Sequence, residues 1–140
     1  MSSSIWAPDG VTNALGAREI LQVACSDLIS ALTILTNVGY FYVAQNSGFT
    51  LAGIEATLLT ASSSGIVTVD INKNGATILS TKLTIDVGEK TSTTAAIPAV
   101  ITDTAINAGD LISIDIDVAG TGAKGLIVTF RGNYNSSLLN

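Results

Sequence analysis

The segment IVTVDINKNG, residues 66–75, decides the fold prediction for this chain. Val67, Val69 and Ile71 alternate with polar residues, which is the period of a strand with one buried face. Asn74-Gly75 follows at once, and this pair tolerates positive φ at both central positions of a tight hairpin turn. The segment therefore predicts a strand at 66–72, a turn, and a second strand running back from residue 76.

The same alternation occurs further along the chain. In LISIDIDV (111–118) four apolar residues point inward, namely Ile112, Ile114, Ile116 and Val118, and in LIVTFRG (126–132) three do, namely Leu126, Val128 and Phe130. We predict further strands at 19–25, 38–45, 49–61 and 76–87, the last broken in its middle. Residues 91–103 contain Pro98, which favours an edge strand or a long crossover. The connector at 27–37 is apolar enough for a short helix, which is the main alternative there.

Composition supports an all-β chain. Of the 140 residues, 43 are Ile, Val or Thr, and such β-branched side chains fit a pleated sheet better than a helix. About eight strands with turn signals every 8–12 residues predict an antiparallel two-sheet sandwich. The proline-containing crossover favours a jelly-roll-like order over a simple meander. We assign residues 1–18 to an extended N-terminal arm, 19–132 to the sandwich and 133–140 to a C-terminal tail.

Charge and residue usage restrict the function. The chain carries a net charge of −5 and only six Lys and Arg residues, so we expect no nucleic-acid partner. It has no histidine and a single cysteine, Cys25, which removes the Ser-His-Asp and Cys-His catalytic groups and cysteine-rich metal sites. No segment has the unbroken apolar length of a membrane helix, and we expect no membrane partner, no cofactor and no enzymatic activity.

Three patterns superficially suggest chemistry. Asp115 and Asp117 share an outward strand face, as Asp70 and Asp86 do on other strands, so these acids offer calcium ligands or acid–base groups; we interpret them instead as solvated acids that limit sheet-to-sheet aggregation. GTGAKG (120–125) looks like a phosphate-binding loop, but a strand follows it where a helix is required, so we predict a hairpin loop. We predict a turn at Ser62, Ser63 and Ser64, because no motif supplies a general base for a serine nucleophile there.

The candidate interface residues are apolar or aromatic. The arm contains Ile5, Trp6, Val11 and Leu15, and the uncharged stretch from Leu28 to Ile54 contains Tyr40 and Tyr42. We expect both regions to bury apolar surface against other molecules. The tyrosines and Trp6 also leave a weak case for glycan binding.

The run from Ala56 to Gly132 resembles a jelly-roll-like module that is frequent in virion structural proteins of tailed bacteriophages. The upstream segment from about residue 20 looks like the first strands of the same module. The resemblance is carried by these motifs: TASSSG (60–65), VDINKNG (69–75), ILSTKLTID (78–86), KTSTTAAIPAVI (90–101), GDLISIDID (109–117) and GTGAKGL (120–126).

This resemblance implies a virion structural protein without catalytic residues. The module often ends long tail-fibre chains, whereas here it follows a short arm. We therefore expect a capsid decoration or cement protein, a homotrimer made in the host cytoplasm that binds the major capsid protein or other virion proteins on the capsid surface. The alternative is a tail- or fibre-associated module that recognises host glycans through loops such as 119–125.

Overall fold

The computed structural model describes residues 16–135, which form antiparallel strands and one short 3-10 helix. The strands are β1 (Arg18–Ala24), β2 (Leu35–Tyr42), β3 (Phe49–Thr57), β4 (Val67–Lys73), β5 (Ala76–Thr77), β6 (Leu79–Thr81), β7 (Leu83–Ile85), β8 (Val100–Ile101), β9 (Ala105–Ile106), β10 (Leu111–Ala119) and β11 (Ile127–Tyr134), with the helix η1 (Ser92–Thr94) before β8. The helix has three residues, and no helix in the described range could cross a membrane.

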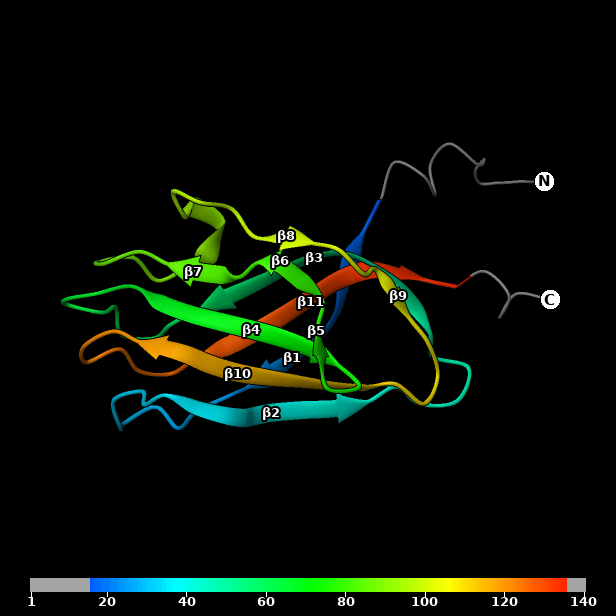
Figure 1. The fold of residues 1–140 in the computed structure, drawn as a ribbon, viewed down its shortest axis with the longest axis horizontal. Helices are drawn as coiled ribbons and strands as arrows, with labels where there is room; N and C mark the ends of the chain where they lie inside the picture. Colours follow the sequence, from blue (N-terminus) through cyan, green and yellow to red (C-terminus); the bar gives the residue numbers. More distant parts are fainter. Residues whose placement is uncertain (1–15, 136–140) are drawn as a thin grey trace.

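Strand pairing follows a nested order. The first strand pairs with the last, β2 pairs with β10, β3 with β9, and β4 with β7. One large sheet has the order β1-β11-β3-β9 and the other the order β2-β10-β4-β5, with β7 also paired to β4 (Figure 1). β6 and β8 form a separate two-stranded sheet. Nested pairs divided between two sheets are the arrangement of a jelly roll. The predicted all-β, jelly-roll-like sandwich is therefore confirmed.

The core lies between the two sheets, and the alternation in the sequence identified most of it. Val67, Val69 and Ile71 of β4 are fully buried, as are the predicted inward residues of β11 and the first three of β10. Val118 was expected inward but is exposed. The pairing of β10 with β4 shifts register between Ile116 and Val118, so the alternation is interrupted before Val118.

The turn at Asn74-Gly75 is also confirmed. Both residues have positive φ, 53° and 90°, and they join β4 to β5 in a tight hairpin. The predicted break in strand 76–87 appears as three short strands, β5, β6 and β7. Pro98 lies in the long crossover between β7 and β8.

Other boundaries differ from the prediction. β2 begins at Leu35 rather than residue 38, because Leu35 pairs with Ile116 of β10. No helix forms at 27–37. The tail prediction overlaps β11, which continues through Tyr134. The predicted arm residues Ile5, Trp6, Val11 and Leu15 lie outside the described residues.

The GTGAKG loop is not a hairpin. β10 belongs to one sheet and β11 to the other, so residues 120–126 carry the chain across the sandwich. A hairpin was expected because two strands flank a glycine-rich segment. Turn residues alone do not reveal that the flanking strands lie in different sheets.

Different strand connections lie at the two ends of the sandwich. The β1–β2, β3–β4, β7–β8 and β10–β11 connections gather at one end, on the left of Figure 1. The β2–β3 and β9–β10 connections lie at the opposite end, where β11 also finishes. This separation positions the surfaces described next.

Candidate interaction surface

Exposed large apolar side chains are concentrated at the end where the β1–β2 and β3–β4 connections meet. We call the surface formed by Leu28, Ile29, Ile34, Leu35 and Leu59 the apolar end. These residues are 59%, 82%, 69%, 57% and 55% exposed, respectively. Monomeric soluble proteins rarely expose large contiguous apolar surfaces, and such surfaces mark sites of interaction.

Backbone hydrogen bonds tie the loops of the apolar end together. The amide of Leu32, a buried residue, donates to the Ala123 carbonyl at 2.8 Å, and the Leu59 amide donates to the Lys124 carbonyl at 2.9 Å. A Cβ built on Gly125 would lie 2.6 Å from Leu59 Cβ and 3.3 Å from Leu28 Cδ2. The absence of a side chain at Gly125 therefore lets both Leu28 and Leu59 pack against its backbone, and the surface is organised before any partner binds.

Asp27 explains why Leu28 and Ile29 stand at the tip of their loop. Its Oδ1 accepts hydrogen bonds from the amides of Ile29 at 2.8 Å and Ser30 at 2.6 Å. This is a turn in which an aspartate side chain replaces a backbone carbonyl. The amide of Ser30, followed by that of Ile29, lowers the pKa of Asp27, so the carboxylate that holds the turn stays ionised.

The uncharged stretch from Leu28 to Ile54 divides into two parts. Its first part supplies most of the apolar end. Its last part does not face outward, because Phe49, Leu51 and Ile54 of β3 belong to the core. The expectation that the whole stretch forms an interface is wrong for these β3 residues, which are needed to close the sandwich.

The predicted interface residues Tyr40 and Tyr42 are both exposed, at 63% and 65%. Their rings meet edge to face with centroids 6.1 Å apart. They lie on β2, which is an edge strand of its sheet. Leu35 begins β2 at the apolar end, whereas Tyr42 ends it about 23 Å away at 3.3 Å per residue, so the tyrosines are not part of the apolar end.

A second surface, which we call the aromatic groove, lies at the opposite end. It has a volume of about 210 Å³, and its walls include Ile20, Phe41, Tyr42, Phe49 and Tyr134. Phe49 is buried and meets the exposed ring of Tyr134 edge to face at 6.3 Å. In the sequence Tyr134 was considered only with the other tyrosines and Trp6 as a weak case for glycan binding, since nothing local indicates that it faces Phe49.

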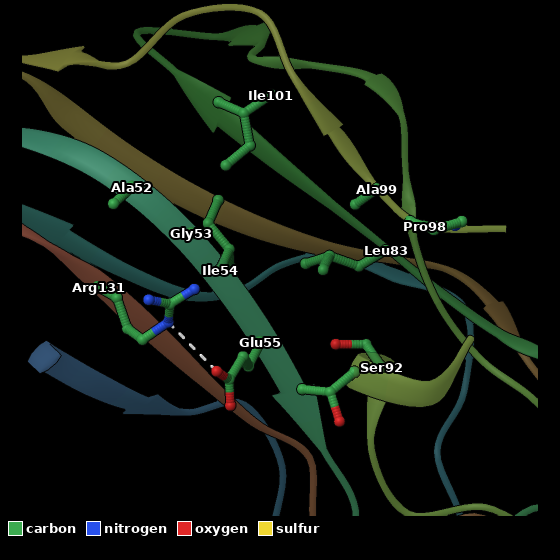
Figure 2. A pocket seen from close by; sticks show the side chains of 11 residues that line it. Ala52, Gly53, Ile54, Glu55, Leu83, Ser92, Pro98, Ala99, Ile101 and Arg131 are labelled. Atoms are coloured by element: carbon green, nitrogen blue, oxygen red, sulfur yellow. Dashed lines mark ion pairs between the residues drawn. The ribbon is translucent and has the colours of Figure 1, made fainter. Parts of the chain in front are cut away.

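A third hollow of about 270 Å³ lies beside β3, between Gly53 and Pro98 (Figure 2). Arg131 crosses over Gly53, where a Cβ would collide with its guanidinium, and its Nε lies 3.2 Å from Glu55 Oε2. Ser92 lines the hollow, but its hydroxyl already accepts a hydrogen bond from the Ala56 amide at 2.9 Å. Arg131 and Glu55 thus form an ion pair at this hollow.

The acids on the outer face of the other sheet are bonded within the protein. Asp70 and Asp115 lie directly opposite each other on β4 and β10, where two like charges repel. Asp70 accepts a hydrogen bond from Thr77, and Asp115 accepts one from Asn72 at 2.9 Å. Lys82 lies 2.5 Å from Asp117 and 3.7 Å from Asp70. The interpretation of Asp70 as a solvated acid is wrong, because Asp70 is buried at 7% exposure.

The remaining candidates have structural contacts. Asp86 accepts a hydrogen bond from the Ala96 amide at 2.9 Å. The Ser62 hydroxyl is buried between two loops: it contacts the Gly65 carbonyl at 2.7 Å and accepts from the Thr121 amide at 3.0 Å. Burial raises the pKa of the Cys25 thiol to about 12. Among residues 16–135, no group of three His, Cys, Asp or Glu side chains is placed to hold a metal ion.

Comparisons with known proteins give no further assignment. No family model, curated protein or solved structure matches the chain.

Proposed function

We propose that this chain is a non-enzymatic structural protein of a bacteriophage virion, a capsid decoration protein that binds the assembled head and stabilises it. The observation that carries the proposal is the apolar end, an exposed aliphatic surface on loops already fixed by backbone hydrogen bonds. The assignment to a virion comes from the resemblance of residues 56–132 to the phage module.

The mechanism requires only differential binding. A protein that binds the assembled shell and not its free subunits stabilises the shell by mass action. Burying one large aliphatic side chain contributes about 1.5–3 kcal/mol. Ile29, Ile34 and Leu28 are exposed in the free protein, so their burial against the shell supplies binding free energy without any chemical step.

We further propose that the chain acts as a homotrimer through the edges of its sheets. β1 and β2 are edge strands of their respective sheets. The sequence of β2, LTNVGYFY, contains no charged residue that would oppose the addition of another strand. Both edges lie on the same side of the sandwich, where Gly39 of β2 contacts Val23 of β1, so burying that side between neighbouring copies covers both unpaired edges. Tyr40 and Tyr42 lie on β2, one of these edges.

The apolar end is tested by binding the full-length protein to purified heads that lack it. Replacing Ile29 and Ile34 with Ser should weaken binding by at least about 10-fold, since 1.4 kcal/mol corresponds to a factor of ten. Val100→Ser is the matched control, because Val100 is an exposed aliphatic residue on β8. Equal occupancy of the heads by the I29S/I34S variant and the control would contradict the proposal.

The receptor-binding alternative predicts a different result. It assigns recognition to loop 119–125, but in this loop Ala123 is buried and the Lys124 amide donates to the Thr60 carbonyl at 3.1 Å. Specific glycan binding that is lost in Lys124→Ala and retained in I29S/I34S would favour the alternative over head binding.

A further inference from the structure

The aromatic groove is left open by the described residues, and its rim carries apolar surface. Tyr42 and Tyr134 are 65% and 55% exposed, and both line the hollow together with the buried Phe49. Exposed aromatic rings around an apolar hollow favour an apolar or aromatic side chain as occupant.

We propose that residues 5–15 of the same chain fill this groove, with Trp6 as the anchoring side chain. The segment contains Ile5, Trp6, Val11 and Leu15, and Asp9 is its only charged side chain. This inference does not depend on the proposed function, because it concerns how the chain covers its own surface at the end opposite the apolar end.

The point at which the segment joins the sandwich supports this occupant. Gly16 lines a hollow of about 530 Å³ together with Arg18, Ile20 and Tyr134. Ile20 and Tyr134 also line the aromatic groove, so the two hollows share a wall. Gly16 has a φ of 57°, a left-handed conformation, so the extended backbone of β1 does not continue through Gly16.

Chain length permits the contact. Trp6 lies ten residues before Gly16, and an extended chain spans at most about 33 Å over that number of residues. The shared wall at Ile20 is only four residues beyond Gly16. Because the segment is tethered beside the groove, its effective concentration there is in the millimolar range, which favours the chain's own segment over that of another copy.

The C-terminal residues 136–140 are the competing occupant, since they follow β11 at the same end and contain Leu138 and Leu139. They offer two adjacent aliphatic side chains and no aromatic ring. Residues 5–15 offer an aromatic ring at Trp6 and aliphatic side chains spread from Ile5 to Leu15, which suit two adjoining hollows better. The test below separates the two segments.

Trp6 is the only tryptophan of the chain, so its fluorescence reports on this contact directly. In the full-length protein we expect blue-shifted emission and slow quenching by acrylamide. Tyr42→Ala and Tyr134→Ala should each red-shift the emission and raise the quenching constant several-fold. Ile97→Ala is the control, because Ile97 is 66% exposed in the crossover between β7 and β8 and does not line the groove, and it should leave both signals unchanged.

Three results would overturn the proposal. The first is Trp6 emission and quenching in the native protein equal to those of the urea-unfolded chain. The second is loss of the blue shift in a Leu138→Ser/Leu139→Ser variant with Tyr42 and Tyr134 intact, which would assign the groove to the tail. The third is emission that red-shifts on dilution, which would assign the segment to a neighbouring copy.

Discussion

Gly39 of β2 lies against Val23 of β1, across the two sheets. A Cβ built on Gly39 would lie 2.7 Å from Val23 Cγ1 and 3.0 Å from Cys25 Sγ. The glycine thus lets the edge strands β1 and β2 of the two sheets approach closely, which closes this side of the sandwich.

Gly39→Ala should therefore destabilise the fold. An added methyl group in a packed contact forces side chains or backbone to move, at a cost of about 1–3 kcal/mol. The free energy of unfolding from urea titration measures this cost. Thr36→Ala, an exposed position on the same strand, is the control, and equal stability of the two variants would refute the close-packing account.

Gly120 and Gly122 test the loop that crosses between the sheets. Both have positive φ, 63° and 73°, but a Cβ on Gly120 would collide with the buried Ser62 side chain, whereas one on Gly122 meets no atom within 4 Å. Both alanine variants incur the backbone cost, of about 1 kcal/mol. We expect Gly120→Ala to be the less stable by a further 1–3 kcal/mol or so, because it also disrupts the Ser62 hydrogen bonds. Melting temperatures that coincide would argue against this contact.

The Cys25 thiol should be unreactive in the native protein. Its pKa is raised to about 12 by burial, so at pH 8 almost no thiolate forms, and thiolate is the reactive species. Labelling by a disulfide reagent should proceed only as fast as the protein unfolds. Rapid stoichiometric labelling of the folded chain would contradict the burial of Cys25.

The raised pKa of Cys25 also predicts how the free energy of unfolding changes at alkaline pH. The native thiol holds its proton more tightly than the unfolded one, so its contribution is complete below the unfolded pKa and decreases as the pH rises from there toward the native value. Cys25→Ser should flatten this decrease. An unchanged alkaline slope in urea titrations would show that Cys25 does not contribute.

Asp110 contributes to the loss of stability that we expect at acid pH. Its carboxylate accepts a hydrogen bond from the Asn107 amide at 2.8 Å and another from Asn74 at 3.0 Å. The Asn107 bond is the main cause of its lowered pKa. A lowered native pKa stabilises the fold above the unfolded pKa, and this contribution is lost as the pH falls through the native one. Asp110→Asn should reduce stability at pH 7 and weaken its dependence on pH below 4 or so; an acid transition identical to that of the wild type would exclude the effect.

Much of the fold could be predicted because local signals and the tertiary structure agree. Val67, Val69 and Ile71 alternate without interruption and end at Asn74-Gly75, so both the buried face and the turn follow from the residues. Pro98 predicted an edge strand or a long crossover for residues 91–103, and this segment contains both a crossover and the short strand β8. These features depend on neighbouring residues, and the sequence presents them directly.

The remaining features depend on residues far apart in the chain. Val118 is exposed because of a register shift against β4, and Asp70 is buried beneath Thr77 and Lys82. The surfaces were equally hard to predict. Leu28 and Leu59 meet only because the 120–126 loop crosses between the sheets, and Tyr42 and Tyr134 face one groove only because of the nested pairing.

The most direct test of the central claim is electron microscopy of virions carrying a gold label on this protein. The account predicts label distributed over the heads, with loss of that label for the I29S/I34S variant and retention for Val100→Ser. Label confined to tails or fibres, or absent from the particles, would contradict it.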